Sequence, residues 1–428
     1  MTSKNHIFKI DMFMRLMGKI ENVLSLLVMA ACMVMLTMCG LKEGSVPDVP
    51  GGPSGGQDSP DIPSPPKADT LYVTGVEYPE GYDWGKDVEY GTVACSLFVE
   101  KNGERIIEVP VGHFYETASD PDMHRCIDGH LYTDYSSDSE TVVKRDGMTL
   151  FRYPGREMIH SFHVADGDVY TAGSPRNGSG GFVFRKNGAA AVSVGDGWLL
   201  SDIHSDGGRI CLAFSAASVF EYEGDTYAPG YYMYSGGEIS AIGRSGAESD
   251  VLAARMIDGK ICYVAGTGGR TDGYVLCAGG VTRSISTEGY GDIYACRIMS
   301  GKSDIFLSAY CCMSGECRYA VWRSSGTVAF ALEPGELPYY SFIDGDDIYG
   351  FVAPDDSFSE MLCYRNGSVH ISYGKDVSFL GSVPAAVCKG GLYFICSGKS
   401  APRKPYMAEE TDIRSFPFNG YFTSVSVW

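Results

Sequence analysis

The sequence has few positive charges for its size, and they form no cluster. Its 428 residues hold 34 lysines and arginines against 53 aspartates and glutamates, which gives a formal net charge of −19 at pH 7. A chain this acidic repels phosphate backbones, and binding to nucleic acid would need a basic face that no stretch of the sequence supplies. We therefore expect no nucleic-acid partner.

The sequence also lacks the linear motifs of common catalytic and metal sites. It contains no Gly-x-Ser-x-Gly, no His-Glu-x-x-His, no phosphate-binding glycine loop and no calcium-binding loop. Nothing in it therefore predicts a cofactor, a metal or a catalytic residue. An active site assembled from distant parts of the chain is not excluded by these absences.

What the sequence does contain is a tight turn that recurs at a near-constant spacing. The second glycines of these turns are 44, 41, 49, 43, 46 and 41 residues apart. Each turn lies between two short β-rich runs, the pattern of a two-residue hairpin with positive φ at its centre. A repeat of this length is typical of a β-propeller blade, so the chain is predicted to be all-β. The turns are Asn102-Gly103, Asp146-Gly147, Asn187-Gly188, Gly236-Gly237, Gly279-Gly280, Ser325-Gly326 and Asn366-Gly367.

A second signal, a turn residue followed by an apolar strand that often carries tyrosine, runs in phase with the first. Its eight copies, from Asp69 to Gly75 through Gly390 to Ser397, predict eight blades. In the last unit Glu409-Glu410-Thr411 replaces the Asn-Gly turn, which leaves seven blades as the alternative. The C-terminal Phe422 to Trp428 matches the strand that precedes the other copies, so we expect it to complete the first sheet and close the ring.

This repeat resembles that of a family of bacterial secreted proteins and lipoproteins, frequent in the Bacteroidota. Their unit is DG-x-x-VYVAG, a variable loop, then WKNG before an apolar strand. The best-matching copies here are Asp166 to Val194 and Asp344 to Ser372, and the resemblance covers about 360 residues. It implies a propeller located outside the cytoplasm, and it carries over no catalytic residue.

Residues 1–39 resemble a bacterial lipoprotein signal, because a basic start is followed by an apolar run that ends at Cys39. We expect lipidation at Cys39 and a location at the bacterial outer membrane, facing the periplasm or the exterior. Such signals have a small residue where this chain has Met38, so Cys32 is an alternative site. An uncleaved transmembrane anchor is the other alternative.

Residues 40–68 are rich in glycine, proline and serine, and they are predicted to be a flexible linker. Fully extended, such a segment reaches about 90 Å. The propeller domain is therefore expected to span residues 69–428 and to stand clear of the membrane that holds it.

Two groups of residues are candidates for ligand binding. The first is aromatic and lies in long loops, where binding surfaces usually form: Tyr82, Trp84, Tyr222 and Tyr227. These rings would stack on a sugar or a partner side chain, or alternatively pack against one another to hold the loops down.

The second group would line the central channel. Arg125, His163, Arg255 and Arg297 each lie three residues before the residue that opens their turn, so equal register places them at one height. Such a ring would suit an anion, an acidic sugar or a carboxylate. The alternative is that each cation pairs with a carboxylate such as Asp202, or with water in the channel.

Most of the 14 cysteines fall inside apolar strands, where they are expected to be buried. Cys311, Cys312 and Cys317 lie on a loop and lack the further ligands of a zinc site.

The function we expect is a membrane-tethered, non-catalytic propeller that binds a glycan or a protein. The alternatives are a propeller glycoside hydrolase or polysaccharide lyase, and a purely structural surface protein.

Overall fold

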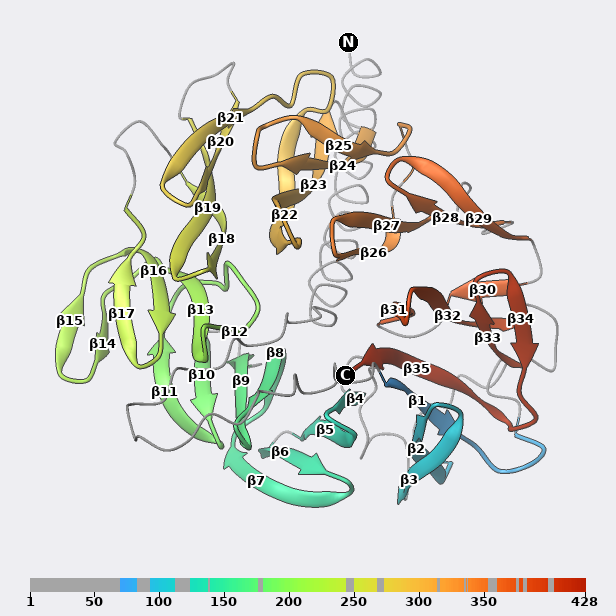
Figure 1. Ribbon diagram of the computed structural model, residues 1–428. Helices are drawn as coiled ribbons and strands as arrows, with labels where there is room; N and C mark the ends of the chain where they lie inside the picture. The colour runs from blue at the N-terminus through green and yellow to red at the C-terminus, as the bar shows by residue number, and fades with distance from the viewer. Residues whose placement is uncertain are drawn as a thin grey trace, which may run out of the picture.

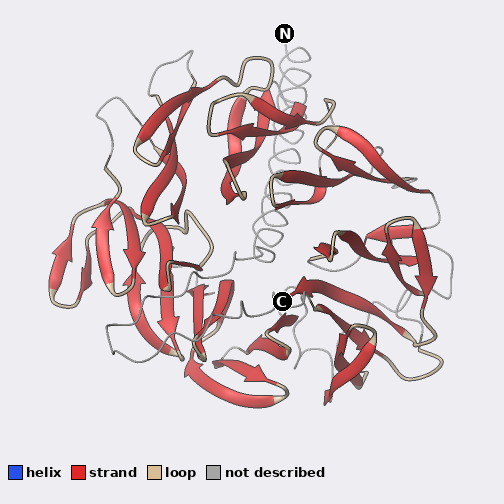
Figure 2. Cartoon of the chain, in the orientation of Figure 1, coloured by secondary structure: helices blue, strands red, loops and turns tan. Residues whose placement is uncertain are grey.

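The computed structural model describes residues 70–82, 93–111, 124–137, 139–175, 180–243, 250–267, 273–313, 316–334, 336, 338–352, 360–374, 377–379, 383–398 and 404–428. These residues form strands and turns with no helix among them (Figure 2), and so none of them belongs to a helix able to span a membrane. The expected signal at 1–39, including Cys39 and Cys32, and the expected linker at 40–68 lie outside the described residues.

Eight sheets are arranged in a ring around a common axis, which confirms the predicted all-β propeller and decides for eight blades over seven (Figure 1). We refer to the centre of this ring, towards which the inner strands lie, as the channel. We number the blades I to VIII in chain order. Seven blades are consecutive in the chain, and blade I combines the first three strands with the last one. Successive strands within a blade run from the channel outwards, except that the inner strand of blade I is the C-terminal one.

The strands fall into four positions from the channel outwards. The inner strands are β35 (Gly420–Val427), β4 (His124–Ile127), β8 (Glu157–Ala165), β12 (His204–Asp206), β18 (Val251–Ile257), β22 (Asp292–Ser300), β26 (Pro338–Asp344) and β31 (Ala385–Cys388). The second strands are β1 (Leu71–Glu77), β5 (His130–Ser136), β9 (Asp168–Pro175), β13 (Arg209–Ala216), β19 (Lys260–Gly266), β23 (Ile305–Met313), β27 (Asp347–Val352) and β32 (Gly391–Gly398).

The third strands are β2 (Cys95–Lys101), β6 (Glu140–Arg145), β10 (Phe182–Lys186), β16 (Gly230–Ser235), β20 (Tyr274–Ala278), β24 (Glu316–Arg323), β28 (Met361–Arg365) and β33 (Pro405–Glu409). The outer strands are β3 (Glu104–Val111), β7 (Met148–Pro154), β11 (Ala189–Val194), β17 (Glu238–Ala241), β21 (Val281–Ile285), β25 (Val328–Ala331), β29 (Ser368–Gly374) and β34 (Asp412–Ser415). Blade IV adds a hairpin of β14 (Phe220–Tyr222) and β15 (Asp225–Tyr227), and blade VIII adds β30 (Val377–Phe379).

The recurring turn is held by one repeated hydrogen bond. In blade III, Asn187 has a φ of 50°, and its side-chain oxygen accepts a bond from the backbone N–H of Val169 at 2.8 Å. The side chain at the turn thereby ties the third strand to the start of the second strand. The same contact recurs for Asn102 with Leu71, Asp146 with Leu131, Asn366 with Ile348, and Glu410 with Leu392.

Glu410 explains how the last unit, which lacks the Asn-Gly turn, still forms a blade. It adopts a φ of 51°, and its carboxylate accepts the Leu392 N–H at 2.9 Å. A glutamate therefore replaces the turn asparagine in both conformation and hydrogen bonding. The last unit forms a complete blade as a result.

The C-terminal strand closes the ring as predicted. β35 pairs antiparallel with β1 from Leu71↔Val427 to Glu77↔Gly420. The hydroxyl of Thr74 lies 2.6 Å from the hydroxyls of both Thr423 and Ser424, in a buried contact across this seam. With β35 in place, the inner edge of β1 is paired within the chain and is not available for pairing with another chain.

Neighbouring blades pack face to face through aromatic and aliphatic side chains. Phe351 of blade VII and Phe394 of blade VIII are fully buried, with ring centroids 4.8 Å apart. Phe184 of blade III and Tyr234 of blade IV lie 4.9 Å apart. The core is thus a series of inter-blade layers, and the channel-lining strands are held rigidly by what lies behind them.

The blade faces differ in character. The turns between first and second strands and between third and outer strands share one end of the ring, which we call the turn face. The connections between second and third strands and between blades emerge at the other end, which we call the loop face. Because each inner strand is followed by a turn on the turn face, every inner strand begins at the loop face and ends at the turn face.

Candidate functional site at the loop-face mouth of the channel

The inner strand of blade IV is split by a bulge. Its regular part, β12, covers only His204–Asp206, opposite Arg209–Cys211. Nearer the loop face, Leu200 N–H donates to Ala213 O at 2.8 Å, and Ser215 N–H donates to Trp198 O at 2.9 Å. Residues 201–203 therefore project from the strand between these two paired segments.

The bulge is fixed from both sides. From blade III, the Ser161 hydroxyl accepts the N–H of Ile203 at 2.8 Å. From blade V, Ala254 N–H donates to Leu200 O at 3.1 Å. Bulges are frequent next to functional sites, and this one contains Asp202.

Asp202 lies within a group of charged residues on neighbouring inner strands. Burial within the ring raises the pKa of its carboxyl to about 6, although the positive charges of Arg297 and then Arg255 oppose the rise. Asp202 is nevertheless partly exposed to solvent. A carboxyl whose pKa is raised by burial and lowered by nearby positive charge is frequent at functional sites.

His204 anchors the base of the bulge. Its Nδ1 lies 2.9 Å from the carbonyl oxygen of Asp202, and its Nε2 lies 3.1 Å from that of Met256 in blade V. Both contacts favour the protonated ring, because a neutral imidazole has only one N–H to donate. Burial and the nearby Arg255 outweigh them and lower the pKa of His204 to about 3, so the ring is neutral at physiological pH.

Two exposed aromatic side chains lie near the loop face, one in the segment that precedes β12 and one near the start of β22. Trp198 is 54% exposed, yet its backbone is paired with Ser215 through both its N–H and its carbonyl. A Cβ at the neighbouring Gly197 would lie 2.1 Å from Ser215 O, so only glycine permits this approach. Tyr294 of β22 is 45% exposed and is the extra residue of a bulge between Ile293 and Ala295.

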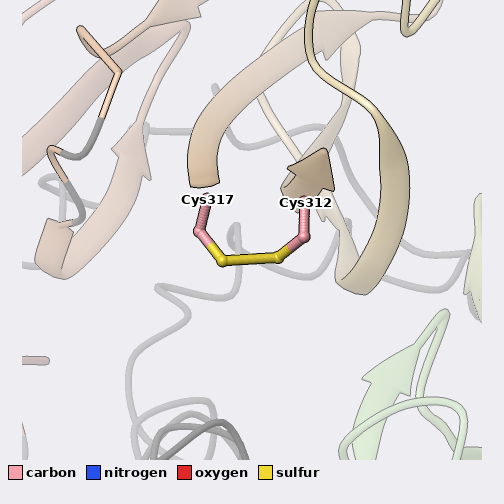
Figure 3. Close-up of a disulfide and its surroundings, with 2 residues drawn as sticks. All are labelled: Cys312 and Cys317. Carbon is pink, nitrogen blue, oxygen red and sulfur yellow. A yellow bond between two sulfur atoms is a disulfide. The ribbon is translucent and has the colours of Figure 1, made fainter. Parts of the chain in front are cut away.

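A disulfide braces the hairpin behind Tyr294. Cys312 is the last residue but one of β23, and Cys317 is the second residue of β24, directly opposite it. The bond joins them across the loop-face end of blade VI (Figure 3). Cys312 is also paired in register with Asp292 at the start of β22. Ten other described cysteines lie outside this disulfide, and nine of these are buried.

The predicted ring of cations is only partly assembled around Asp202. Arg297 donates from Nη2 to Ser341 O of blade VII at 2.5 Å and stays partly exposed, whereas Arg255 is buried. His163 lies 2.8 Å through its Nε2 from the Ser205 hydroxyl, next to the bulge. Arg125 instead forms a buried ion pair with Asp134 at 2.7 Å and covers the ring of Phe162 at 4.7 Å.

The predicted aromatic loop residues pack among themselves. Tyr222 donates its hydroxyl to Gly237 O at 2.7 Å, and Tyr227 stacks on Phe220 at 5.0 Å. The ring of Tyr82 lies 4.9 Å from that of Tyr78. The structure brings Tyr222 and Tyr227 together in the β14–β15 hairpin, apart from Tyr82, and Trp84 lies outside the described residues.

Comparison with known proteins gives similarity of fold only. No family model and no curated protein matches this chain. Among solved structures, "Dihydro-heme d1 dehydrogenase NirN in complex with DHE" aligns over 83% of this chain and 74% of its own, with 11% identity and a TM-score of 0.47. BamB from Moraxella catarrhalis aligns over 73% and 97%, with 10% identity and a TM-score of 0.41. BBS1N in complex with ARL6DN aligns over 65% and 88%, with 9% identity and a TM-score of 0.29.

The sequence did not single out Trp198 or Tyr294, and it indicated Asp202 only as an alternative partner of the cations. A partial signal was present, because Ser201-Asp202 interrupts the apolar inner strand of blade IV between Leu200 and Ile203. No group of three or more histidine, cysteine, aspartate or glutamate side chains with the geometry of a metal site occurs in the part of the chain that the structure describes.

Proposed function

We propose that this protein is a membrane-tethered binding propeller that takes an acidic glycan at the loop-face mouth of its channel. Arg297 and Arg255 would attract the carboxylate of the sugar. Trp198 and Tyr294 would stack on its apolar ring faces. A positively charged site inside so acidic a protein selects for a ligand that the rest of the surface repels.

The observation that carries this proposal is the bulge at residues 201–203. It is held by Ser161 on one side and Ala254 on the other, and it places Asp202 where the charges of two arginines act on its carboxyl. Because Arg297 and Arg255 already act on a carboxylate of the protein, they have the charge and location to attract a carboxylate of a ligand. Rigid elements that fix such groups reduce the entropic cost of binding.

Lipid attachment at Cys39 and an outer-membrane location, facing the periplasm or the exterior, are part of the same proposal. The disulfide between Cys312 and Cys317 supports an oxidising compartment outside the cytoplasm. Metabolic labelling with a palmitate analogue tests the attachment. Label that is lost in Cys39→Ser and kept in Cys32→Ser supports Cys39, and the reverse result assigns Cys32.

A lyase or hydrolase acting on the same class of glycan is the second candidate function. Asp202 favours it, because a carboxyl with a pKa of about 6 can donate and accept protons near neutral pH. Release of shorter or unsaturated saccharides from an acidic polysaccharide would support catalysis, provided that Asp202→Asn abolishes it. Binding without turnover supports the non-catalytic function.

An array of neutral and acidic oligosaccharides, probed with the detergent-solubilised full-length chain, tests the proposed function. We expect retention of uronic-acid oligosaccharides and its loss in Arg297→Gln. Trp428→Ala is the matched control, because Trp428 is also exposed but follows β35 at the turn face. Retention of neutral glycans only, or of none, would overturn the proposal and favour a protein partner or a structural role.

A further inference from the structure

The disulfide of blade VI lies within reach of solvent. Cys312 and Cys317 are both partly exposed at the loop-face end of the blade (Figure 3). Their neighbours towards the tip of the hairpin, Met313 and Glu316, are exposed. A thiol in solution can therefore approach the two sulfur atoms, which is the first requirement for thiol–disulfide exchange.

The hairpin does not depend on this bond for its pairing. β23 and β24 are paired without a shift in register as far as Met313↔Glu316, one pair beyond Cys312↔Cys317. The two cysteines are only 5 residues apart in the sequence, and closing so short a loop removes little entropy from the unfolded chain. The ladder therefore holds the two strands together with or without the cross-link.

The backbone of Cys312 is packed tightly against the start of the inner strand. Cys312 is paired in register with Asp292 of β22. A Cβ at Gly291 would lie 2.4 Å from the carbonyl oxygen of Cys312, so only glycine permits this approach. Tyr294, which is 45% exposed near the loop face, follows two residues after Asp292. A displacement of Cys312 therefore moves the segment that carries Tyr294.

We propose that Cys312 and Cys317 form a redox switch: a dithiol reductant opens the disulfide, and the open form loosens the loop-face end of β22 and weakens ligand binding at the channel mouth. The switch rests on the proposed function only for the identity of the ligand. It goes beyond that function by giving the chain a modification site that responds to the redox state of its surroundings.

The reaction is a two-step exchange. A thiolate of the dithiol attacks one sulfur atom, the bond between Cys312 and Cys317 breaks, and a mixed disulfide forms while the other cysteine leaves as a thiolate and takes up a proton. The second thiol of the reductant then attacks the mixed disulfide and releases the remaining cysteine. Two electrons and two protons pass to the protein, and the reductant leaves as its own disulfide.

Cys311, the cysteine next to the switch, takes no part in the exchange. Successive residues of a strand point to opposite faces, and Cys311 is fully buried on the other face of β23. Burial raises the pKa of its thiol to about 12, so it carries no thiolate at neutral pH. Reoxidation therefore restores the bond between Cys312 and Cys317.

The first test uses the full-length chain without any ligand. Dithiothreitol is added under native conditions, and the thiols are alkylated and located by mass spectrometry. We expect Cys312 and Cys317 to be labelled at least about tenfold faster than Cys296, which is partly exposed in the same blade, and than the buried cysteines. Hydrogen–deuterium exchange of residues 291–294 should become about tenfold faster on reduction.

The double variant Cys312→Ser with Cys317→Ser reproduces the open form without a reductant. Its exchange at 291–294 should match that of the reduced native chain, and dithiothreitol should change it no further. Cys296→Ala is the matched control, because Cys296 lies on β22 outside the disulfide, and it should keep the full response. A galacturonate oligosaccharide should bind about fivefold more weakly to both open forms, because they hold Tyr294 less rigidly.

Reduction only at urea concentrations that also expose the buried cysteines would overturn the switch, and so would ready reduction that leaves exchange at 291–294 unchanged. Equal affinity of the oxidised and reduced chains for the oligosaccharide also overturns the switch, while the proposed function stands. Faster exchange on reduction in a chain that binds no glycan supports the switch and overturns the proposed function.

Discussion

The hydroxyl oxygen of Ser161 in blade III accepts a hydrogen bond from the backbone N–H of Ile203 in blade IV, at 2.8 Å. Ser161 is buried, so water cannot replace it as a partner for that N–H. This contact therefore sets the position of the bulge at residues 201–203. The affinity of the channel mouth should depend on a residue that touches no ligand.

Removing the Ser161 hydroxyl tests whether ligand affinity depends on this contact. Ser161→Ala leaves a buried N–H without its acceptor, and we expect a loss of about 1–2 kcal/mol of unfolding free energy, with several-fold weaker binding of acidic saccharides. Urea unfolding and calorimetric titration measure the two effects. Ser303→Ala is the control, because Ser303 bonds Asp346 across blades VI and VII at the turn face. A binding loss of the same size in Ser303→Ala would show that general destabilisation is the cause.

The free energy of unfolding should fall on mild acidification, because His204 takes up a proton more readily in the unfolded chain than in the folded protein. Burial and Arg255 lower its pKa to about 3, well below the unfolded value, so the folded state binds fewer protons between these limits. Stability is then fully present above pH 6.5 and is lost as pH falls, by about 2 kcal/mol at pH 5. His204→Gln keeps one donor and should flatten this slope in urea unfolding.

The control for the preceding prediction is His130→Gln. His130 is half-exposed and faces Asp146 at 2.7 Å, so His130→Gln should change the free energy of unfolding by at most a few tenths of a kcal/mol. An unchanged slope in His204→Gln would contradict the account of a buried neutral imidazole.

Glu410 stands at the turn position that asparagine occupies in other blades, and we expect substitutions there to change the stability of the protein. Glu410 has positive φ and accepts the Leu392 N–H, so Glu410→Ala should destabilise the protein by about 1–2 kcal/mol. Glu410→Asn restores the residue type found at Asn187 and should be neutral or stabilising, because asparagine tolerates this backbone conformation. Thermal unfolding compares the two variants, and equal losses would show that the side-chain contact is unimportant.

The propeller could be predicted from the sequence because its repeat has a local cause. An Asn-Gly or Asp-Gly turn needs positive φ, and the turn side chain must reach the second strand of the same blade. Both requirements appear at fixed spacing and are visible without knowing what lies beside each blade. The same logic predicted closure, since Phe422 to Trp428 matched a strand position that blade I lacked.

The channel mouth could be predicted only in part, because its geometry comes from contacts between blades. Equal spacing placed Arg255 and Arg297 in one group with Arg125, but it gave no means of knowing that Asp134 pairs with Arg125. The bulge that contains Asp202 depends on Ser161 and Ala254 from the neighbouring blades, and no pattern within blade IV encodes it.

The most direct test of the central claim is calorimetric titration of the full-length chain with a galacturonate oligosaccharide at about pH 5, comparing Trp198→Ala and Arg297→Gln with the control Trp428→Ala. Loss of a charged hydrogen-bonding group costs roughly 1.5–3 kcal/mol, so we predict that Arg297→Gln weakens binding at least tenfold. Trp198→Ala should weaken it by about tenfold, and Trp428→Ala should bind as the native chain does. Equal affinity in all four proteins, with each still folded, would contradict a ligand site at the loop-face mouth of the channel.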